Sequence, residues 1–326
     1  MSEDLKDVRA ETRAGIVLGA LVADAATMGL HWLYDPERLA SIARTREPVF
    51  LAADQDHFKD AKGYFAHEGK QAGELSQYGS VLVLAMDSLV AGRGELDISD
   101  YQMRYVAFFG PGGLWRGYID RPTRGSLANL GATITDETPA VSGIDDDQLP
   151  ALSPVPAIVA ADPGHPELEE RVIEMVRVTN DNGLAAEAAL ITARLIRSML
   201  RGENLSASLA EEADRAGDVL QPLLGDALSR ADEDPVDVAG HFGRACHVHQ
   251  GLPVAFHILN AASGYEDGIR NNILAGGDSC GRSMVIGSVL AASHGFGGER
   301  GIPLPWVTRL ADGARLFDQA YRLGAV

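Results

Sequence analysis

The sequence predicts an all-α fold in a single domain that spans residues 1–326. Apolar residues recur at positions i, i+3, i+4 and i+7, the spacing of one helix face, in four long segments: 13–30, 78–90, 184–200 and 283–295. Runs that alternate apolar and polar residues, as strands do, are almost absent. Flexible linkers and internal repeats are absent too, so one large multi-helix bundle is expected.

The first helical segment, RAGIVLGALVADAATMGL at 13–30, is apolar on nearly all sides and rich in alanine and glycine. Small side chains let helix axes approach closely, so this segment and the similar 283–295 are expected at the centre of the bundle. Asp24 interrupts the first segment. A carboxylate there is costly unless it is hydrogen-bonded or faces a pocket, which leaves a functional site and a capped helix end both open.

Pro, Gly and Asp cluster between the periodic segments, and these clusters predict loops at 34–39, 109–125, 145–158, 161–170 and 298–306. Asp162 or a neighbour is expected to cap a helix whose first turn carries Glu167, Glu169 and Glu170. The stretch TNDNG at 179–183 should end that helix and begin the next, because Asn and Asp side chains compete for nearby backbone groups.

The composition predicts a folded cytoplasmic protein that binds neither nucleic acid nor a membrane. Hydrophobic residues make up 46% of the chain, and the net charge of −18 opposes binding to a phosphate backbone. Two cysteines suggest no disulfide framework, and the charged N-terminus lacks the features of a secretory signal. Asp24 and Asp87 interrupt the apolar stretches, so no membrane-spanning segment is expected.

The stretch GGDSCGRS near the C-terminus combines a tight turn with a helix start. Gly276 and Gly277 allow the turn, and Asp278 or Ser279 can cap the helix that follows. Backbone N–H groups and the helix dipole then favour an anion at this point, and Arg282 can add a bidentate phosphate contact. Capping alone and anion binding are both open.

A second polar cluster precedes the helical segment 78–90. It contains His67, Glu68, Glu74, Ser76, Gln77 and Tyr78. Capping accounts for Ser76, while the other side chains form a polar mouth that could line a pocket.

Other candidate residues have ordinary explanations. His31 lies beside Trp32 as a packed side chain would, and Cys280 is expected to be a small buried filler. A zinc site is a further possibility at ACHVH, where the candidate ligands are Cys246, His247 and His249. The spacing of these residues matches no usual zinc motif. Surface ion pairing, with phosphate contact as the alternative, is expected of the 120–124 segment: Asp120, Arg121 and Arg124.

These segments, in this order, resemble the ADP-ribosylglycohydrolase family, and especially its J-crystallin-like branch, over nearly the whole chain. GIVLGALVADAATMGLHWLYD at 15–35 is similar to the family's N-terminal helix with its Gly-Asp-Ala signature. SQYGSVLVLAMDSL at 76–89 is similar to the helix that opens with Thr-Asp-Asp-Thr. The most specific likeness is GGDSCGRS, where members have Gly-Gly-Asp-Thr-Asp-Thr before a small-residue helix.

The resemblance implies a central cleft for ADP-ribose and, in active members, two magnesium ions held by the Thr-Asp-Asp-Thr and Asp-x-Asp-Thr elements. In this chain, four residues without a carboxylate stand in place of the first element: Ser76, Gln77, Tyr78 and Gly79. Asp278 is the only retained carboxylate of the second, because Cys280 replaces the other aspartate. Magnesium prefers oxygen ligands and usually carboxylates, so the usual two-magnesium centre is not expected, and no other cofactor is indicated.

The resemblance therefore implies a hydrolase of an N- or O-glycosidic bond in an ADP-ribosyl or related ribosyl compound, free or protein-linked. Asp24, Glu74 and Asp278 are the candidate acid/base or water-positioning groups, and His31, where many members have a glutamate, and His67 are possible proton carriers. The expected substrate-binding residues are Ser76, Gln77, Tyr78, Gly276, Gly277, Ser279 and Arg282.

Two alternatives stay open. The first is a non-catalytic protein that binds an ADP-ribose-like ligand or has a structural role, as crystallin relatives do. The second is an enzyme that uses the CHVH cluster with a transition metal. The sequence does not predict the oligomeric state.

Overall fold

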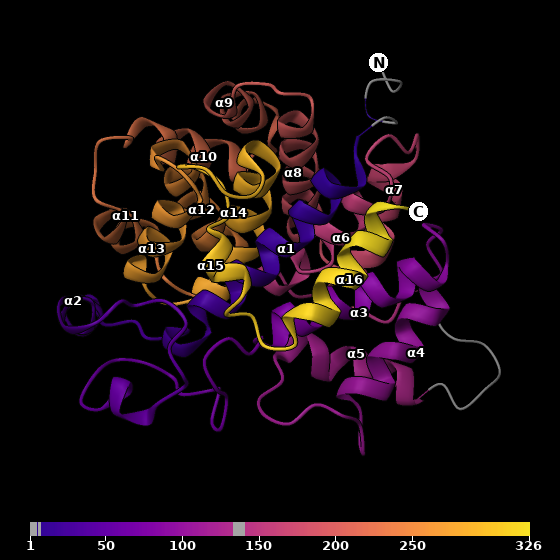
Figure 1. Cartoon of the computed structure of the whole chain (residues 1–326), viewed down its shortest axis with the longest axis horizontal. Helices are drawn as coiled ribbons and strands as arrows, with labels where there is room; N and C mark the ends of the chain where they lie inside the picture. Colours follow the sequence, from indigo (N-terminus) through magenta and orange to yellow (C-terminus); the bar gives the residue numbers. More distant parts are fainter. Residues whose placement is uncertain (1–4, 6–7, 133–140) are drawn as a thin grey trace.

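A computed structural model describes residues 5, 8–132 and 141–326 of the chain. Throughout these described residues, the backbone forms helices joined by loops, and extended pairing is limited to isolated bridges (Figure 1). The predicted all-α fold is therefore confirmed.

The centre of the bundle is the pair formed by α1 (Ala10–Thr27) and α14 (Ser279–His294), and α16 (Gly313–Gly324) packs on α1. The axes of α1 and α14 cross at two glycines. A Cβ atom placed on Gly19 would lie 2.3 Å from the Cβ of Ala291 and 2.5 Å from the carbonyl oxygen of Gly287. The glycine- and alanine-rich composition of both helices is thus what permits their contact.

Gly19→Ala is expected to lower the free energy of unfolding by about 1–3 kcal/mol, because a methyl group there overlaps the backbone of α14. Urea unfolding followed by circular dichroism measures the change. The matched control is Gly225→Ala in another helix, where a Cβ meets nothing within 4 Å and which should be neutral or slightly stabilising. Equal effects of the two substitutions would contradict the close packing at Gly19.

The other helices surround this pair. In the view of Figure 1, one group lies to the right: α3 (Gln77–Ala91), α4 (Ile98–Phe109), α5 (Arg121–Ala132), α6 (Val155–Ala161) and α7 (Leu168–Val176). A second group lies toward the top and left: α8 (Gly183–Leu200), α9 (Leu205–Arg215), α10 (Leu220–Ser229), α11 (Pro235–Phe242), α12 (Val248–Ala261) and α13 (Tyr265–Ala275). Shorter elements complete the chain: η2 (Met28–Leu30), α2 (Pro36–Thr45), η3 (Gln55–Phe58), η4 (Leu149–Leu152) and α15 (Leu304–Val307).

Several stretches expected to be loops contain helices. Helix α2 begins inside the expected loop 34–39, where Asp35 caps it and Pro36 is its first residue. The expected loop 145–158 likewise contains η4 and the start of α6. Proline is tolerated in the first turn of a helix, because the N–H it lacks would have no partner there, so these prolines mark helix starts.

The expected helix cap at Asp162 is wrong. Helix α7 begins at Leu168, and the Asp162 carboxylate instead accepts the backbone N–H of Gly164 in a turn. The boundary predicted at 179–183 is confirmed, because Asn182 caps α8 by accepting the N–H groups of Leu184 and Ala185. Asparagine at this position offers a side-chain acceptor to the free N–H groups of the first turn.

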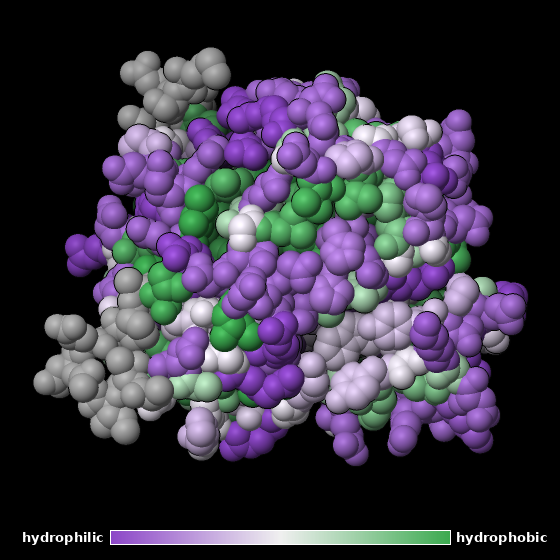
Figure 2. All heavy atoms as spheres, turned by 180° about the vertical axis from the view of Figure 1, so that it is seen from behind, coloured by the Kyte–Doolittle hydropathy of each residue, from purple (hydrophilic) through white to green (hydrophobic). Residues whose placement is uncertain are grey.

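The segment Ala10–Leu30 is long and apolar enough to cross a membrane, contrary to the expectation from Asp24. Its whole apolar window is buried inside the fold, however, as in the core helix of a globular protein. The surface is different in character: the face shown in Figure 2 is mainly hydrophilic, with separate hydrophobic patches.

Candidate functional site

The site is built around the start of α14, where Asp278 is the N-cap residue. Gly276 and Gly277 precede it with φ angles of 73° and 69°, a left-handed conformation that favours glycine. A Cβ atom on Gly277 would lie 2.0 Å from the carbonyl oxygen of Arg244. These two glycines therefore shape the turn, and their predicted contact with a substrate stays a prediction.

The glycine turn also holds the segment that follows η2. The N–H of Trp32 donates to the carbonyl of Gly277, and the N–H of Gly277 donates to the carbonyl of Leu33, each at 2.8 Å. Trp32 has a φ of 62°, which is a rare conformation for a bulky residue. This reciprocal pair of bonds fixes His31, the residue before Trp32, next to Asp278.

Three side chains from separate segments form a hydrogen-bonded chain. Nε2 of His31 lies 2.8 Å from Oδ1 of Asp278, and Nδ1 of His31 lies 2.7 Å from Nε2 of His67. Asp278 is 0% exposed, His31 1% and His67 7%, so this row of hydrogen-bonded side chains runs from the interior toward the surface. An imidazole that is bonded through both ring nitrogens can pass a proton from one neighbour to the other.

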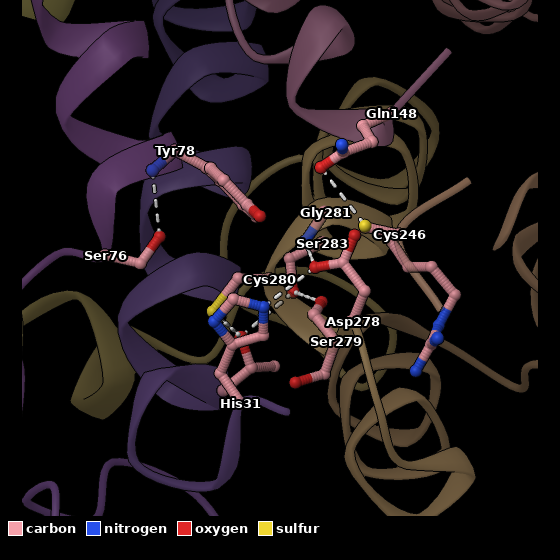
Figure 3. Close-up of polar contacts among 12 residues, drawn as sticks. His31, Ser76, Tyr78, Gln148, Cys246, Asp278, Ser279, Cys280, Gly281 and Ser283 are labelled. Atoms are coloured by element: carbon pink, nitrogen blue, oxygen red, sulfur yellow. Dashed lines mark hydrogen bonds and ion pairs between the residues drawn. The ribbon is translucent and has the colours of Figure 1, made fainter. Parts of the chain in front are cut away.

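Several polar atoms near this chain have no hydrogen-bond partner among the described residues: Oδ2 of Asp278, the hydroxyls of Tyr78 and Ser279, Nε1 of Trp32 and Nη1 of Arg282. Such buried groups are rare, because each costs free energy when it is left unpaired. Figure 3 shows the Tyr78 side chain extending from α3 toward the segments that carry Cys246 and Asp278. The unpaired atoms indicate a place for a polar ligand or water.

Arg282 is fully buried, one turn into α14. Its Nε donates to Oδ1 of Asn272, and its Nη2 donates to the carbonyl oxygens of Asn272 and Gly276. Burial lowers the pKa of Arg282 to about 10, which still leaves it charged at neutral pH, while Asp278 raises it. Arg282 is thus a fixed cation behind the Asp278 carboxylate, and only its Nη1 is left for a ligand.

Among the described residues, no hydrogen bond joins Asp24 to Asp278; Asp24 binds Ser76 instead. Its Oδ2 accepts the Ser76 N–H at 2.8 Å and its Oδ1 accepts the Ser76 hydroxyl. Burial raises the pKa of Asp24 to about 6, against the opposing effect of these bonds. Ser76 in turn caps α3 by accepting the N–H of Tyr78, so Asp24 anchors the start of that helix to α1.

Two other predicted residues lie elsewhere. Gln77 joins α3 to the start of α5, because it accepts the N–H of Asp120 and donates to the hydroxyl of Thr123. Glu74 accepts the N–H of Gln71 in a turn at 2.6 Å. Neither forms a hydrogen bond with Asp278, His31 or His67 among the contacts of the described residues.

The segment 120–124 forms the start of α5, where a loop was expected. Asp120 is buried and accepts the N–H of Thr123, as a helix cap does. Arg121 pairs with Asp146 at 2.8 Å, and Arg124 donates to the carbonyl of Ile119. The predicted ion pairing is therefore found for Arg121.

The CHVH cluster does not converge on one point. His247 and His249 both turn Nδ1 toward the Asp147 carboxylate, at 2.6 and 3.4 Å, whereas the Cys246 thiol donates to Oε1 of Gln148. Burial raises the pKa of the Cys246 thiol, with Asp278 contributing, so it is held in the protonated form. Within the described part of the chain, no three His, Cys, Asp or Glu side chains group as metal ligands.

The donor set around Asp278 does not fit a pair of magnesium ions. It offers one carboxylate, a buried thiol at Cys280, a phenol at Tyr78 and imidazoles at His31 and His67. Magnesium requires near-octahedral oxygen ligation, usually with carboxylates. The chemistry available here is proton transfer and hydrogen bonding by the side chains themselves.

An open pocket of about 380 Å³ lies beside this site and is lined in part by Tyr34, Lys62 and Arg244. It is linked to the site through the backbone, because the carbonyl of Arg244 accepts the N–H of Asp278 at 3.0 Å. Two cationic side chains at the pocket favour an anionic ligand.

An aromatic cluster that packs over His31 was not predicted from the sequence. Trp32 contacts Tyr118 and Tyr64, with ring centroids 5.1 and 5.7 Å apart, and those two tyrosines contact each other at 5.6 Å. Their positions at 32, 64 and 118 share no motif. The only signal was the Trp next to a candidate histidine, which indicates packing but not its partners.

His67 is expected to make the protein less stable at acid pH. Burial, with the charges of His31 and Lys70, holds its pKa well below the ordinary 6.5. Below pH 6.5 the unfolded chain binds a proton that the folded His67 resists, so stability present above that pH is lost as the pH falls. Urea unfolding measured above and below pH 6.5 should show that the free energy of unfolding falls less with acid in His67→Gln than in the parent.

This comparison isolates the effect of His67, because Asp24 is present in both proteins and contributes equally to them. The effect of Asp24 on stability has the opposite sign. The pKa of Asp24 is raised to about 6, so the folded state binds a proton before the unfolded state does and gains stability as the pH falls toward 3.8. Identical pH profiles for the parent and His67→Gln would rule out the stated effect of His67.

Comparison with known proteins gives a consistent result. The model of the ADP-ribosylglycohydrolase family matches residues 6–326. Crystallin J1A and Crystallin J1B of Tripedalia cystophora are each 26% identical to this chain, and the alignments cover 99% of it and 98% of each relative. A solved structure described as an ADP-ribosylglycohydrolase-related protein complex has the same fold, with a TM-score of 0.72 at 21% identity over 98% of both chains.

Proposed function

The chain belongs to the ADP-ribosylglycohydrolase family, and from this premise we propose that it hydrolyses an N- or O-glycosidic bond in an ADP-ribosyl or related ribosyl compound without the usual two-magnesium centre. One observation carries the proposal. Oδ1 of Asp278 is engaged by the His31–His67 chain, while Oδ2 of the same carboxylate is buried and has no partner among the described residues. A free carboxylate oxygen backed by a proton route is what a general base needs.

In the proposed reaction, Oδ2 of Asp278 accepts a proton from the water that attacks the anomeric carbon. The bond from that carbon to the leaving group breaks through an oxocarbenium-like state, which the negative charge of Asp278 stabilises. The leaving group takes up a proton from solvent, while the Tyr78 hydroxyl, which has no other partner among the described residues, can donate a hydrogen bond to it. The proton on Asp278 then leaves through His31 to His67, the most exposed member of the chain.

The substrate class follows from charge. The protein as a whole is strongly acidic, with a net charge of −18, so an anionic ligand needs local cations. Lys62 and Arg244 at the adjoining pocket, with Arg282 behind Asp278, supply them. This arrangement supports a phosphate-bearing ribosyl compound as the substrate.

The test is calorimetric titration of ADP-ribose into the purified protein, once with millimolar magnesium and once with a chelator, followed by hydrolysis assays on ADP-ribosyl substrates in both buffers. Binding and turnover that persist in the chelator are expected. Turnover that appears only with magnesium would overturn the metal-independent mechanism. If the protein neither binds ADP-ribose nor hydrolyses an ADP-ribosyl substrate in either buffer, the proposed activity is overturned.

A second candidate function is a non-catalytic role in ligand binding or structure, and the burial of the site favours it. Asp278 and Arg282 are 0% exposed and His31 is 1% exposed, so a substrate reaches them only if the overlying side chains move. The crystallin names of two relatives also support this role. Binding of ADP-ribose with no turnover of any ADP-ribosyl substrate would favour this function over hydrolysis.

A further inference from the structure

A second cavity lies on the opposite face of α3 from Tyr78. This groove has a volume of about 380 Å³ and is formed by α3, α4, α16 and the loop after α4. Ser80, Val83, Leu84 and Asp87 line it at the i, i+3, i+4 and i+7 spacing of one helix face. In Figure 1, α16 crosses in front of α3 and α4 lies to its right, so three helices frame the groove.

The floor and walls of the groove are mainly apolar. Val83 and Leu84 lie at its base, and Phe108 lines it from α4. Leu114 stands at its edge and is 79% exposed, which is high for a large apolar side chain. A surface of this kind in a concave site is typical of pockets that take an organic ligand.

Two arginines add positive charge, one from each flanking helix. Arg104 uses Nε to donate to Asp100, and Arg315 uses Nε to donate to Asp312. No hydrogen bond from the described residues engages the Nη groups of either arginine. Each guanidinium therefore keeps its terminal N–H donors for a ligand, while the Nε bond fixes its orientation.

Asp87 is the opposing charge in the groove. It accepts a bond from Gln319, and it forms no ion pair with either arginine within the described structure. Burial raises the pKa of Asp87, while the charges of Arg315 and Arg104 lower it, so both guanidinium groups act on this carboxylate. The groove thus joins an apolar floor to Asp87 and to two arginines, each of which is paired through Nε with an aspartate.

We propose that this groove binds a small aliphatic carboxylate, whose chain lies on Val83 and Leu84 and whose carboxylate is held by Arg104 and Arg315. The ligand's carboxylate can accept from the Nη groups of both arginines, which the described residues leave unengaged, and its chain removes apolar surface from water. The site is separate from Asp278 and does not depend on the proposed hydrolysis.

The test is calorimetric titration of decanoate into the full-length protein, with decanol as the ligand of equal chain length and no charge. Saturable binding of one decanoate is expected, with decanol at least about tenfold weaker because it lacks the charge-assisted bonds. The double variant Arg104→Met with Arg315→Met should lose decanoate affinity by about tenfold or more. The control is Arg322→Met. Arg322 is exposed, lies on α16 as Arg315 does, and pairs with Asp318, so this variant should bind decanoate as the parent does.

Asp87→Asn should change the affinity for decanoate in the opposite direction to the double arginine variant. It keeps an acceptor for Gln319 but removes the like charge beside the ligand's carboxylate, so affinity for decanoate should rise several-fold. A misfolded variant cannot bind more tightly than the parent, so this result supports the site by itself. Absence of saturable decanoate binding to the parent, or equal binding by the parent and the double arginine variant, would overturn the proposal.

Discussion

Asp278→Asn is expected to lower the turnover of an ADP-ribosyl substrate by about a hundredfold or more, the usual contribution of a general acid or base. Asparagine caps helices as well as aspartate does, and its Oδ1 can still accept from Gly281 and His31. The substitution therefore removes the charge and the basic Oδ2 while the turn and α14 remain. Steady-state kinetics in a chelating buffer measure the loss.

The matched control is Asp35→Asn. Asp35 is also a helix cap, at the start of α2, and accepts the N–H of Arg38 away from the His31–His67 chain. Its variant should keep parental turnover. Full activity in Asp278→Asn would remove Asp278 from the mechanism, whereas loss of activity with unchanged affinity for ADP-ribose would assign it to the chemical step.

Arg282→Met is expected to lower the free energy of unfolding by about 3 kcal/mol, because three buried acceptors lose their donor. These acceptors are Oδ1 and the carbonyl oxygen of Asn272 and the carbonyl oxygen of Gly276. Methionine fills a similar volume, so the loss reports the hydrogen bonds more than the packing. Urea unfolding at neutral pH, followed by circular dichroism, measures it.

Arg282→Lys should lie between the parent and Arg282→Met, because it keeps the charge but not the planar set of donors. The surface control is Arg322→Met, whose side chain is 67% exposed and whose effect should be within about 0.5 kcal/mol. If Arg282→Met and Arg322→Met have the same free energy of unfolding, the buried hydrogen bonds of Arg282 do not stabilise the fold as stated.

The helical fold could be predicted from the sequence, because apolar periodicity is a local property. The segment 184–200 shows this: its spacing predicted the helix, and Asn182 marked its start. The errors occurred where one residue type serves two purposes. Proline at 36 and at 156 was taken as a sign of a loop, yet both residues lie in the first turn of a helix.

The candidate site was only partly predictable. GGDSCGRS predicted the turn and a cap at Asp278 or Ser279 from local chemistry, and Asp278 is the cap. The burial of Arg282 was not predicted: its Nε and Nη2 bind Asn272 and Gly276, where a bidentate phosphate contact was expected. The role of Asp24 was undecided, because a carboxylate in an apolar helix indicates that a partner exists but not which one. Its partner is Ser76, the residue that caps α3.

The sequence by itself determined the helices, their small-residue contact faces and the acidic surface, since each depends on neighbouring residues or on composition. Only the tertiary structure decided that His31 joins Asp278, which is 247 positions away, to His67. It also decided that α3 turns Tyr78 toward the site and Asp87 toward the groove. Contacts between distant segments depend on how whole helices pack, and local patterns do not specify that packing.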